Sequence, residues 1–267
     1  MNFLRLLSRS ASIWIKGGAE QHSAAFAYFI PFALAPLLLI SITLVGVIIG
    51  RADVIELLLR WGGYIDPALP EFMTSSLANF EVLTTTYTVP VLALLFFSIM
   101  ILLSLNSLSG GLQHLWGVEK YGFKNVMRRS GRSIMFVLVF QVYLVATIIC
   151  NNIFTSAALH SGLFIFQILA PLVFFMFTSL LIAIGYGLLP LWAPSFKARL
   201  YGAAIATLLF LFTRTLVTLH VATSPSPDIY GAAGLVFVLL IWIYMSACIV
   251  YYGASFALAY EQKYPTK

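Results

Sequence analysis

The sequence predicts an all-α membrane protein whose helices cross the bilayer several times. Of its 267 residues, 61% are apolar and only 9% are charged, and the mean hydropathy is +0.98. Soluble domains usually contain about 25% charged and about 45–50% apolar residues. So few charges cannot cover a surface that faces water. This excludes an ordinary soluble enzyme, a disordered chain and a secreted disulfide scaffold.

Uncharged stretches of the chain give the number of spans, because a helix needs about 20 apolar residues to cross the hydrocarbon. They predict six, and the polar residues around Asn151 and Asn152 divide the longest stretch into two spans. The predicted spans are residues 24–50, 89–108, 134–154, 164–189, 201–221 and 231–258. Runs such as Val91–Phe97 lack the polar alternation of a transmembrane β-strand. We therefore expect one membrane domain over residues 1–267.

Basic residues predict how the helices are oriented. With the N-terminus inside, twelve of the fifteen Lys and Arg residues fall in cytoplasmic segments, and only Arg51 and Arg60 lie outside. Such a bias is the positive-inside signal. Both termini should therefore be cytoplasmic.

The first 18 residues predict an amphipathic helix that lies in the inner membrane interface. Its apolar side carries Phe3, Leu7 and Trp14. Such a helix turns its basic face toward anionic headgroups. It is either a simple anchor or a regulatory lipid sensor. The residues expected to contact lipid at the inner face are Arg5, Arg9, Lys16, Lys124, Arg128 and Arg129.

Residues 51–88, between the first two spans, predict a periplasmic cap of two short helices. Gly62, Gly63, Pro67 and Pro70 mark a turn between two amphipathic stretches. The cap is either solvated surface or a lid over a pathway. Its acidic residues are Glu56, Asp66, Glu71 and Glu81.

Two prolines mark the first span as a candidate pathway element. Pro31 and Pro36 each remove a helix hydrogen bond and collide with the preceding turn. They either kink the helix or open it along a translocation path. Tyr28, in the same span, is a further pathway candidate.

Arg214 is the one charged residue well inside a predicted span, and no Asp or Glu lies in any of the six. Burying it costs about 2.5–3.5 kcal/mol on insertion scales unless it is paired or solvated. Its counter-charge is Asp228, an acid of the cap, water in a cavity or an anionic substrate; alternatively, Arg214 reaches the outer surface. His220 and Asn106 complete the pathway candidates. Interfacial packing of His220 and helix-to-helix hydrogen bonding by Asn106 are the structural alternatives.

Nothing in the sequence predicts catalysis. It contains no zinc-protease, serine-hydrolase or P-loop motif and no metal-ligand spacing of Cys and His. The basic stretch 120–132 lacks the interleaved aromatic residues typical of nucleic-acid binding. We therefore expect no enzyme activity, no cofactor, no metal and no nucleic-acid partner. Membrane lipids are the expected partners, and an oligomer is compatible with the sequence.

Three strings resemble the YihY/BrkB family of bacterial inner-membrane proteins. They are Ser23–Ile40, with SAAFAYFIPFALAPLLLI, Leu112–Val118, with LQHLWGV, and Tyr230–Ser255 of the final span. The resemblance implies six helices, an inner-membrane location and links to virulence and envelope functions. It also implies a suspected transport role without a settled substrate. The family's former label as a ribonuclease is regarded as mistaken.

Two positions depart from the family pattern. Ser255 follows Gly253-Ala254 where relatives usually have Glu, and Leu211 stands where many have Glu before a basic residue. If these acids couple transport to an ion in relatives, such coupling is in doubt for this chain.

These observations support two hypotheses. The first is a transporter, exporter or flippase-like protein for an amphipathic or anionic envelope component, lipid or lipid-linked. No ATP site is present in the sequence, so transport would be ion-coupled, passive or dependent on a partner. The alternative is a structural or interaction protein of the envelope. A hydrated cavity reaching Arg214 would favour the first, and a solidly packed bundle the second.

Overall fold

The described part of the chain is helical. The computed structural model describes residues 3–33, 88–118, 123–161, 165–223 and 231–264, and no strand occurs among them. The helices are α1 (Phe3–Lys16), α5 (Thr88–Leu115), α6 (Phe123–Ser161), α7 (Ile165–Leu188), α8 (Phe196–Thr223) and α9 (Gly231–Lys263). Residues 19–33, after a turn at Gly17-Gly18, are also helical.

Four of the described helices are long and apolar enough to cross a membrane. The qualifying segments are Met127–Thr147 of α6, Pro171–Leu188 of α7, Phe196–Leu216 of α8 and Leu239–Lys263 of α9. Their outward surface is apolar too: Val142 is 69% exposed and Met176 is 64% exposed. Side chains of this kind are stable on an outer surface that faces lipid. The protein is therefore embedded in a membrane.

The predicted spans coincide with these helices wherever the chain is described. The last four predicted spans fall on α6 to α9, and residues 89–108 lie inside α5. The first predicted span is described, and helical, only as far as residue 33. Residues 51–87 of the predicted cap lie outside the described residues. The total of six spans and their orientation stay predictions.

Helix α6 is longer than the span predicted within it. It begins at Phe123 and runs through Asn151 and Asn152 to Ser161. The polar break predicted around these asparagines therefore does not interrupt the helix, which ends at Ser161. Its basic first turns extend the same helix beyond the apolar stretch.

Backbone contact between α8 and α9 joins these two helices closely. A side chain at Gly202 would collide with the carbonyl oxygen of Gly253, and one at Gly253 would meet the carbonyl oxygen of Gly202. Ala206 and Ala257 line the same contact. Small residues at a helix crossing let membrane helices pack by van der Waals contact at short range.

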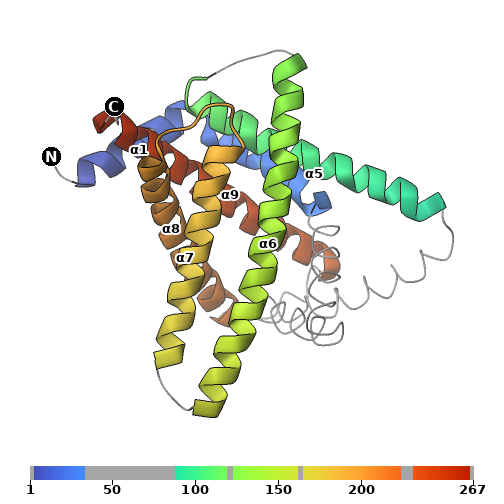
Figure 1. The fold of residues 1–267 in the computed structure, drawn as a ribbon, viewed down its shortest axis with the longest axis vertical. Coiled ribbons are helices and arrows are strands. Elements are labelled where there is room, and N and C mark those ends of the chain that lie inside the picture. Colours follow the sequence, from blue (N-terminus) through green and yellow to red (C-terminus); the bar gives the residue numbers. More distant parts are fainter. Residues whose placement is uncertain (1–2, 34–87, 119–122, 162–164, 224–230, 265–267) are drawn as a thin grey trace.

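One end of the molecule gathers the ends of four helices. Arg132 near the start of α6 donates to the carbonyl of Pro190, which follows α7. Ser195, which precedes α8, donates its backbone N–H to a Glu261 carboxylate oxygen near the end of α9, at 3.2 Å. Figure 1 shows these ends, together with α1 and both termini, on the same side. We call this the basic end, because Lys16 of α1, Arg132 of α6, Arg199 of α8 and Lys263 of α9 lie there.

Helix α1 packs along the final turns of α9. Leu6 is buried against Phe256 and Ala259. Trp14 donates its indole N–H to the Cys248 carbonyl at 3.2 Å, and Tyr252 donates its hydroxyl to the Leu7 carbonyl at 3.2 Å. The expected amphipathic helix therefore rests on protein along one face.

Candidate functional site

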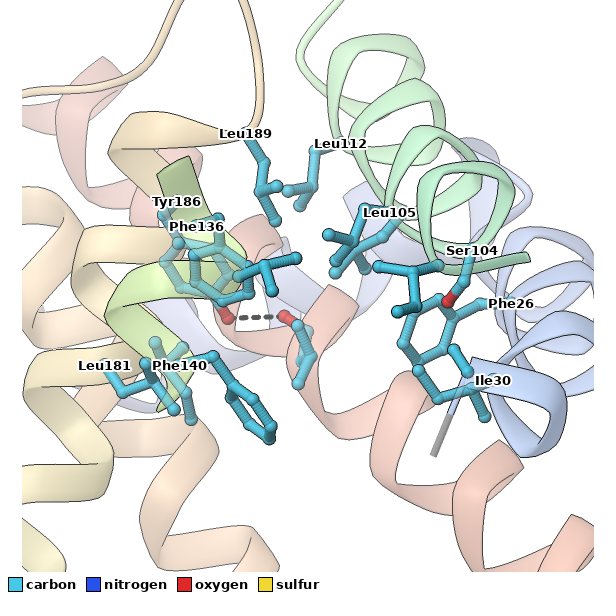
Figure 2. Close-up of a pocket in the computed structure, with 17 residues that line it drawn as sticks. Phe26, Ile30, Ser104, Leu105, Leu112, Phe136, Phe140, Leu181, Tyr186 and Leu189 are labelled. Atoms are coloured by element: carbon cyan, nitrogen blue, oxygen red, sulfur yellow. Dashed lines mark hydrogen bonds between the residues drawn. The ribbon is translucent and has the colours of Figure 1, made fainter. Parts of the chain in front are cut away.

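An apolar cavity lies between five helical segments near the basic end. Its volume is about 220 Å³. Figure 2 shows side chains pointing into it from residues 19–33, α5, α6 and α7, and Val250 contributes from α9. The lining side chains are Phe26, Ile30, Ala33, Ile101, Ser104, Leu105, Leu108, Leu112, Phe136, Val137, Phe140, Leu181, Ile182, Tyr186, Leu189 and Val250, with Gly185.

The lining side chains that come from one helix all lie on the same face of that helix. Phe26, Ile30 and Ala33 recur every three or four residues, and so do Leu105, Leu108 and Leu112. Each set therefore forms a stripe along its helix. The cavity is the space that these stripes leave where the helices diverge.

Two polar side chains stand on the otherwise apolar wall. The Tyr186 hydroxyl donates to the Val250 carbonyl at 2.5 Å, so its polar atom is already satisfied. The Ser104 hydroxyl oxygen is buried and has no hydrogen-bond partner among the described residues. The wall thus offers contact area and very little hydrogen bonding.

The chemistry of the wall decides what the cavity can hold. An engineered cavity of about 150 Å³ lined by Leu, Ile and Phe stays dry and binds benzene, so an apolar space of this size takes apolar molecules and not water or ions. Complete small-molecule sites are larger, at about 300–1,000 Å³. The cavity therefore suits one apolar portion of a larger, amphipathic molecule.

Two arginines near the basic end tie helix ends together through backbone carbonyls. The Arg129 guanidinium donates from Nη2 to the Asn106 carbonyl at 2.6 Å, and Asn106 adjoins Leu105 of the wall. The Arg132 guanidinium donates from Nη1 to the Pro190 carbonyl at 2.5 Å, one residue after Leu189 of the wall. Neither arginine is among the residues that line the cavity.

Asn106 and Arg129 are the predicted site residues that the structure brings together. Arg129 is half-buried, whereas its neighbour Arg128 is exposed. The Asn106 side-chain oxygen is buried and makes no hydrogen bond with any described residue.

The other pathway candidates lie away from the cavity wall. Arg214 is exposed on α8, between the exposed side chains of Phe212 and Leu216. Tyr28 is 64% exposed and contacts the rings of Phe29 and Phe32.

Pro31 is half-buried, and the helix of residues 19–33 continues through it. Pro36 and the side chain of His220 lie outside the described residues. The proposed opening of the first span therefore stays a prediction.

The predicted inner-face lipid contacts are mostly exposed. Arg5, Arg9, Lys16 and Arg128 are exposed, and Arg9 also donates to the side chain of Gln262 at 2.7 Å. The side chain of Lys124 is outside the described part of the structure. The cap acids Glu56, Asp66, Glu71 and Glu81 are outside it as well.

A pair of histidines brings the helix of residues 19–33 into contact with α5. The rings of His22 and His114 have centroids 5.2 Å apart, and the Tyr251 ring lies 6.2 Å from His22. Burial, and secondarily the positive charge of His114, lower the pKa of His22 from its ordinary value of 6.5. Among the described residues, no three His, Cys, Asp or Glu side chains gather to form a metal site.

Sequence reasoning missed the cavity, and none of the predicted site residues is among those that line it. In a chain this apolar, a stripe of Leu and Phe looks the same whether it faces lipid, protein or a cavity. One local signal is Gly185, where a side chain would press within 3.0 Å of the Phe136 ring. A glycine between large residues in a span indicates a site of close approach.

The three strings that resemble a known family pack into one core. Phe26 of the first string packs against the core that contains Leu112 and Trp116 of the second and Tyr251 and Ala254 of the third. The Trp116 indole N–H donates to the Ala254 carbonyl at 3.1 Å. The strings therefore stabilise the helices that enclose the cavity.

Comparison with known proteins gives the same family. A UPF0761 membrane protein of Alcanivorax borkumensis is 26% identical over 258 residues, which is 91% of this chain and 57% of that protein. The chain thus spans little more than half of that relative's length. A UPF0761 membrane protein of Psychromonas ingrahamii is 38% identical over 104 residues, covering 39% of this chain and 36% of the relative. No solved structure matches the chain.

The family comparison covers nearly all of the sequence. The sequence model described as "Virulence factor BrkB" matches residues 14–267. The matched residues include every residue that lines the cavity. The chain belongs to the BrkB family of membrane proteins.

Proposed function

We propose that this protein moves an amphipathic envelope lipid between the leaflets of the membrane, as a flippase-like transporter. The observation that carries the proposal is the apolar cavity of about 220 Å³ that five helical segments enclose. A transporter of polar solutes needs hydrogen-bonding groups along its path, and this wall has almost none. A lipid needs an apolar site for its chain and a polar site for its headgroup.

The proposal uses the predicted topology of six spans with both termini in the cytoplasm of a bacterial cell. The bacterial relatives support that setting. The clustering of basic residues at one end supports its assignment to the cytoplasmic side, because basic segments are retained inside. With this orientation the cavity lies toward the cytoplasmic side, and we propose that a lipid of the inner leaflet enters there.

A pair of matched variants on α6 tests the proposal. Val137 lines the cavity and Val142 points outward with 69% exposure, so the same change to Phe fills the cavity in one variant and meets lipid in the other. Filling the cavity costs a bound chain about 1.4 kcal/mol or more, which corresponds to about a tenfold loss in rate.

The measurement is transbilayer movement of a fluorescent phospholipid in proteoliposomes. We expect Val137→Phe to slow movement about tenfold while Val142→Phe keeps the wild-type rate. Equal rates in both variants, with wild-type protein active, would exclude the cavity as the path. A folded wild-type protein that moves no lipid would favour the alternative, a structural or interaction protein of the envelope.

A further inference from the structure

The start of α8 and the end of α9 together form an aromatic and basic surface that contributes nothing to the cavity wall. We propose that this surface binds the headgroups of anionic phospholipids in the leaflet at the basic end. Its members are Lys197, Tyr201, Tyr260, Lys263 and Tyr264, and we call it the tyrosine–lysine surface. None of the five is among the lipid contacts predicted from the sequence. The inference is independent of lipid movement and applies equally to a structural protein of the envelope.

Ring contacts join the three tyrosines across the two helices. The ring centroids of Tyr201 and Tyr260 are 4.8 Å apart, and those of Tyr260 and Tyr264 are 5.0 Å apart. The Lys263 ammonium nitrogen lies 4.6 Å from the centroid of the Tyr264 ring, which is within the range of a cation–π interaction. Lys197 precedes Tyr201 by one helical turn, so both lie on the same face of α8. The five side chains therefore form one continuous surface.

The tyrosine–lysine surface faces outward. Tyr201 is 53% exposed and Tyr264 is 49% exposed, and Lys197 is exposed as well. Leu200, beside Tyr201, is 42% exposed. Aromatic rings, hydroxyl groups and an ammonium group can therefore be reached from outside the helix bundle.

The position of this surface along the helices matches the level of lipid headgroups. The segment of α8 that is apolar enough to cross a membrane begins at Phe196, and that of α9 ends at Lys263. The surface thus lies where the hydrocarbon gives way to the headgroups. Tyrosine is enriched at this level because its ring is apolar and its hydroxyl is polar, and lysine extends its ammonium group toward the headgroups.

Positive charge exceeds negative charge at the tyrosine–lysine surface. Glu261 is the one acidic residue on α8 and α9, and its carboxylate accepts from the backbone N–H of Ser195 at 3.2 Å. The first turns of α8 and the last turn of α9 carry three basic residues, Lys197, Arg199 and Lys263. Basic residues near a membrane surface favour anionic lipids over zwitterionic ones. The charge of the surface therefore complements an anionic headgroup such as that of phosphatidylglycerol.

The alternative is that the three rings only pack α8 against α9. Such packing would not distinguish one headgroup from another. A preference for anionic lipid that depends on the two lysines separates the two interpretations.

The experiment measures which lipid lies beside the tyrosine–lysine surface in nanodiscs. The full chain, with Cys150 and Cys248 replaced by Ala, carries one bimane-labelled cysteine, either Leu200→Cys beside the surface or Val142→Cys on α6, where the side chain is 69% exposed. The discs contain phosphatidylcholine and increasing amounts of spin-labelled phosphatidylglycerol or spin-labelled phosphatidylcholine, with the nitroxide on the same acyl chain. Bimane fluorescence falls when the nitroxide of a neighbouring lipid comes close.

We expect spin-labelled phosphatidylglycerol to reach half-quenching at position 200 at a mole fraction about fivefold lower than spin-labelled phosphatidylcholine. At position 142 the two lipids should agree within about twofold, because no basic residue of the tyrosine–lysine surface lies there.

Charge variants test the role of the two lysines. Lys197→Gln combined with Lys263→Gln should reduce the preference at position 200 to within about twofold. Arg214→Gln removes a charge further along α8 and should keep the preference, as should Lys197→Arg combined with Lys263→Arg, which retains both charges. If the glutamine pair does not fold, salt replaces it, since screening of exposed charges at high ionic strength should reduce the preference of the wild type.

Four results would overturn the inference. They are equal half-quenching by the two lipids at position 200, a preference that the glutamine pair leaves unchanged, a preference that high salt leaves unchanged, or an equally strong preference at position 142. The last would show that anionic lipid is enriched around the whole protein. Absence of quenching by either lipid at position 200 would overturn the inference as well, because it would show that protein, such as a second copy of the chain, covers the surface.

Discussion

His22 shows how one titratable side chain ties stability to pH. It precedes the predicted first span, and its pKa lies below 6.5 in the folded protein because burial and His114 disfavour its charged form. The unfolded chain therefore binds more protons than the folded one between the two pKa values. This group leaves stability unaffected above about pH 7, and it lowers stability as the pH falls through 6.5 toward the folded pKa.

We predict that thermal unfolding in detergent shifts to lower temperature between about pH 7 and pH 5. In His22→Gln this shift should be smaller, because Gln does not titrate. If the unfolding temperatures of wild type and His22→Gln depend on pH in the same way, groups other than His22 control that dependence.

Arg214 shows the limit of residue-level prediction. The sequence correctly marks it as the charged residue inside the fifth predicted span, but it cannot say which way the side chain points. Helix α8 is apolar around most of its circumference, so no polar stripe indicates its inner face. The structure places Arg214 on the outer surface, away from the described cavity.

The exposed position of Arg214 leads to a second prediction. Arg214→Gln should leave lipid movement in proteoliposomes within about twofold of wild type, because the side chain does not line the cavity. A loss as large as that expected for Val137→Phe would place the pathway along α8 instead.

Helix packing gives a prediction at the scale of elements. Gly202→Ala should destabilise the protein by about 1–3 kcal/mol, because the new methyl group meets the backbone of α9. Gly131→Ala is the matched control on α6, since a side chain there meets nothing within 4 Å. It should be neutral or stabilise by up to about 1 kcal/mol through helix propensity.

Denaturant unfolding of the two variants in the same detergent measures the difference. Opposite signs are expected for the two changes. Destabilisation of Gly131→Ala by as much as Gly202→Ala would show a general intolerance of glycine replacement and not the contact of α8 with α9.

Helices could be predicted from the sequence, and their ends and contacts could not. Twenty apolar residues suffice to identify a span, which is why the last four predicted spans fall on α6 to α9. The start of α6 at Phe123 was missed because the charged residues around Arg128 lower the hydropathy of its first turns.

The cavity belongs to the whole molecule, since five segments from distant parts of the sequence enclose it. Its wall joins Ile30 to Leu181 and Val250, and no local pattern relates these residues. Arg129 was predicted to contact lipid and Asn106 to lie on a pathway, but only the fold places them together.

The predicted topology can be tested with single cysteines in a chain whose native Cys150 and Cys248 are replaced. Ser12 and Gln262 are exposed near the basic end, so cysteines there should react with a membrane-impermeant maleimide only from the cytoplasmic side. A cysteine at Glu71 of the predicted cap should react only from the periplasmic side. If the cysteines at positions 71 and 262 are labelled from the same side of the membrane, the predicted topology of six spans is excluded.

Occupancy of the cavity by a lipid chain tests the central claim most directly. A phospholipid with a diazirine near the end of one acyl chain is photolysed in membranes containing the protein, and the labelled peptides are identified by mass spectrometry. We predict labelling of cavity residues such as Phe136 and Ile182 that Val137→Phe abolishes and Val142→Phe preserves. Labelling confined to outward-facing residues such as Val142 and Met176, unchanged by Val137→Phe, would contradict it.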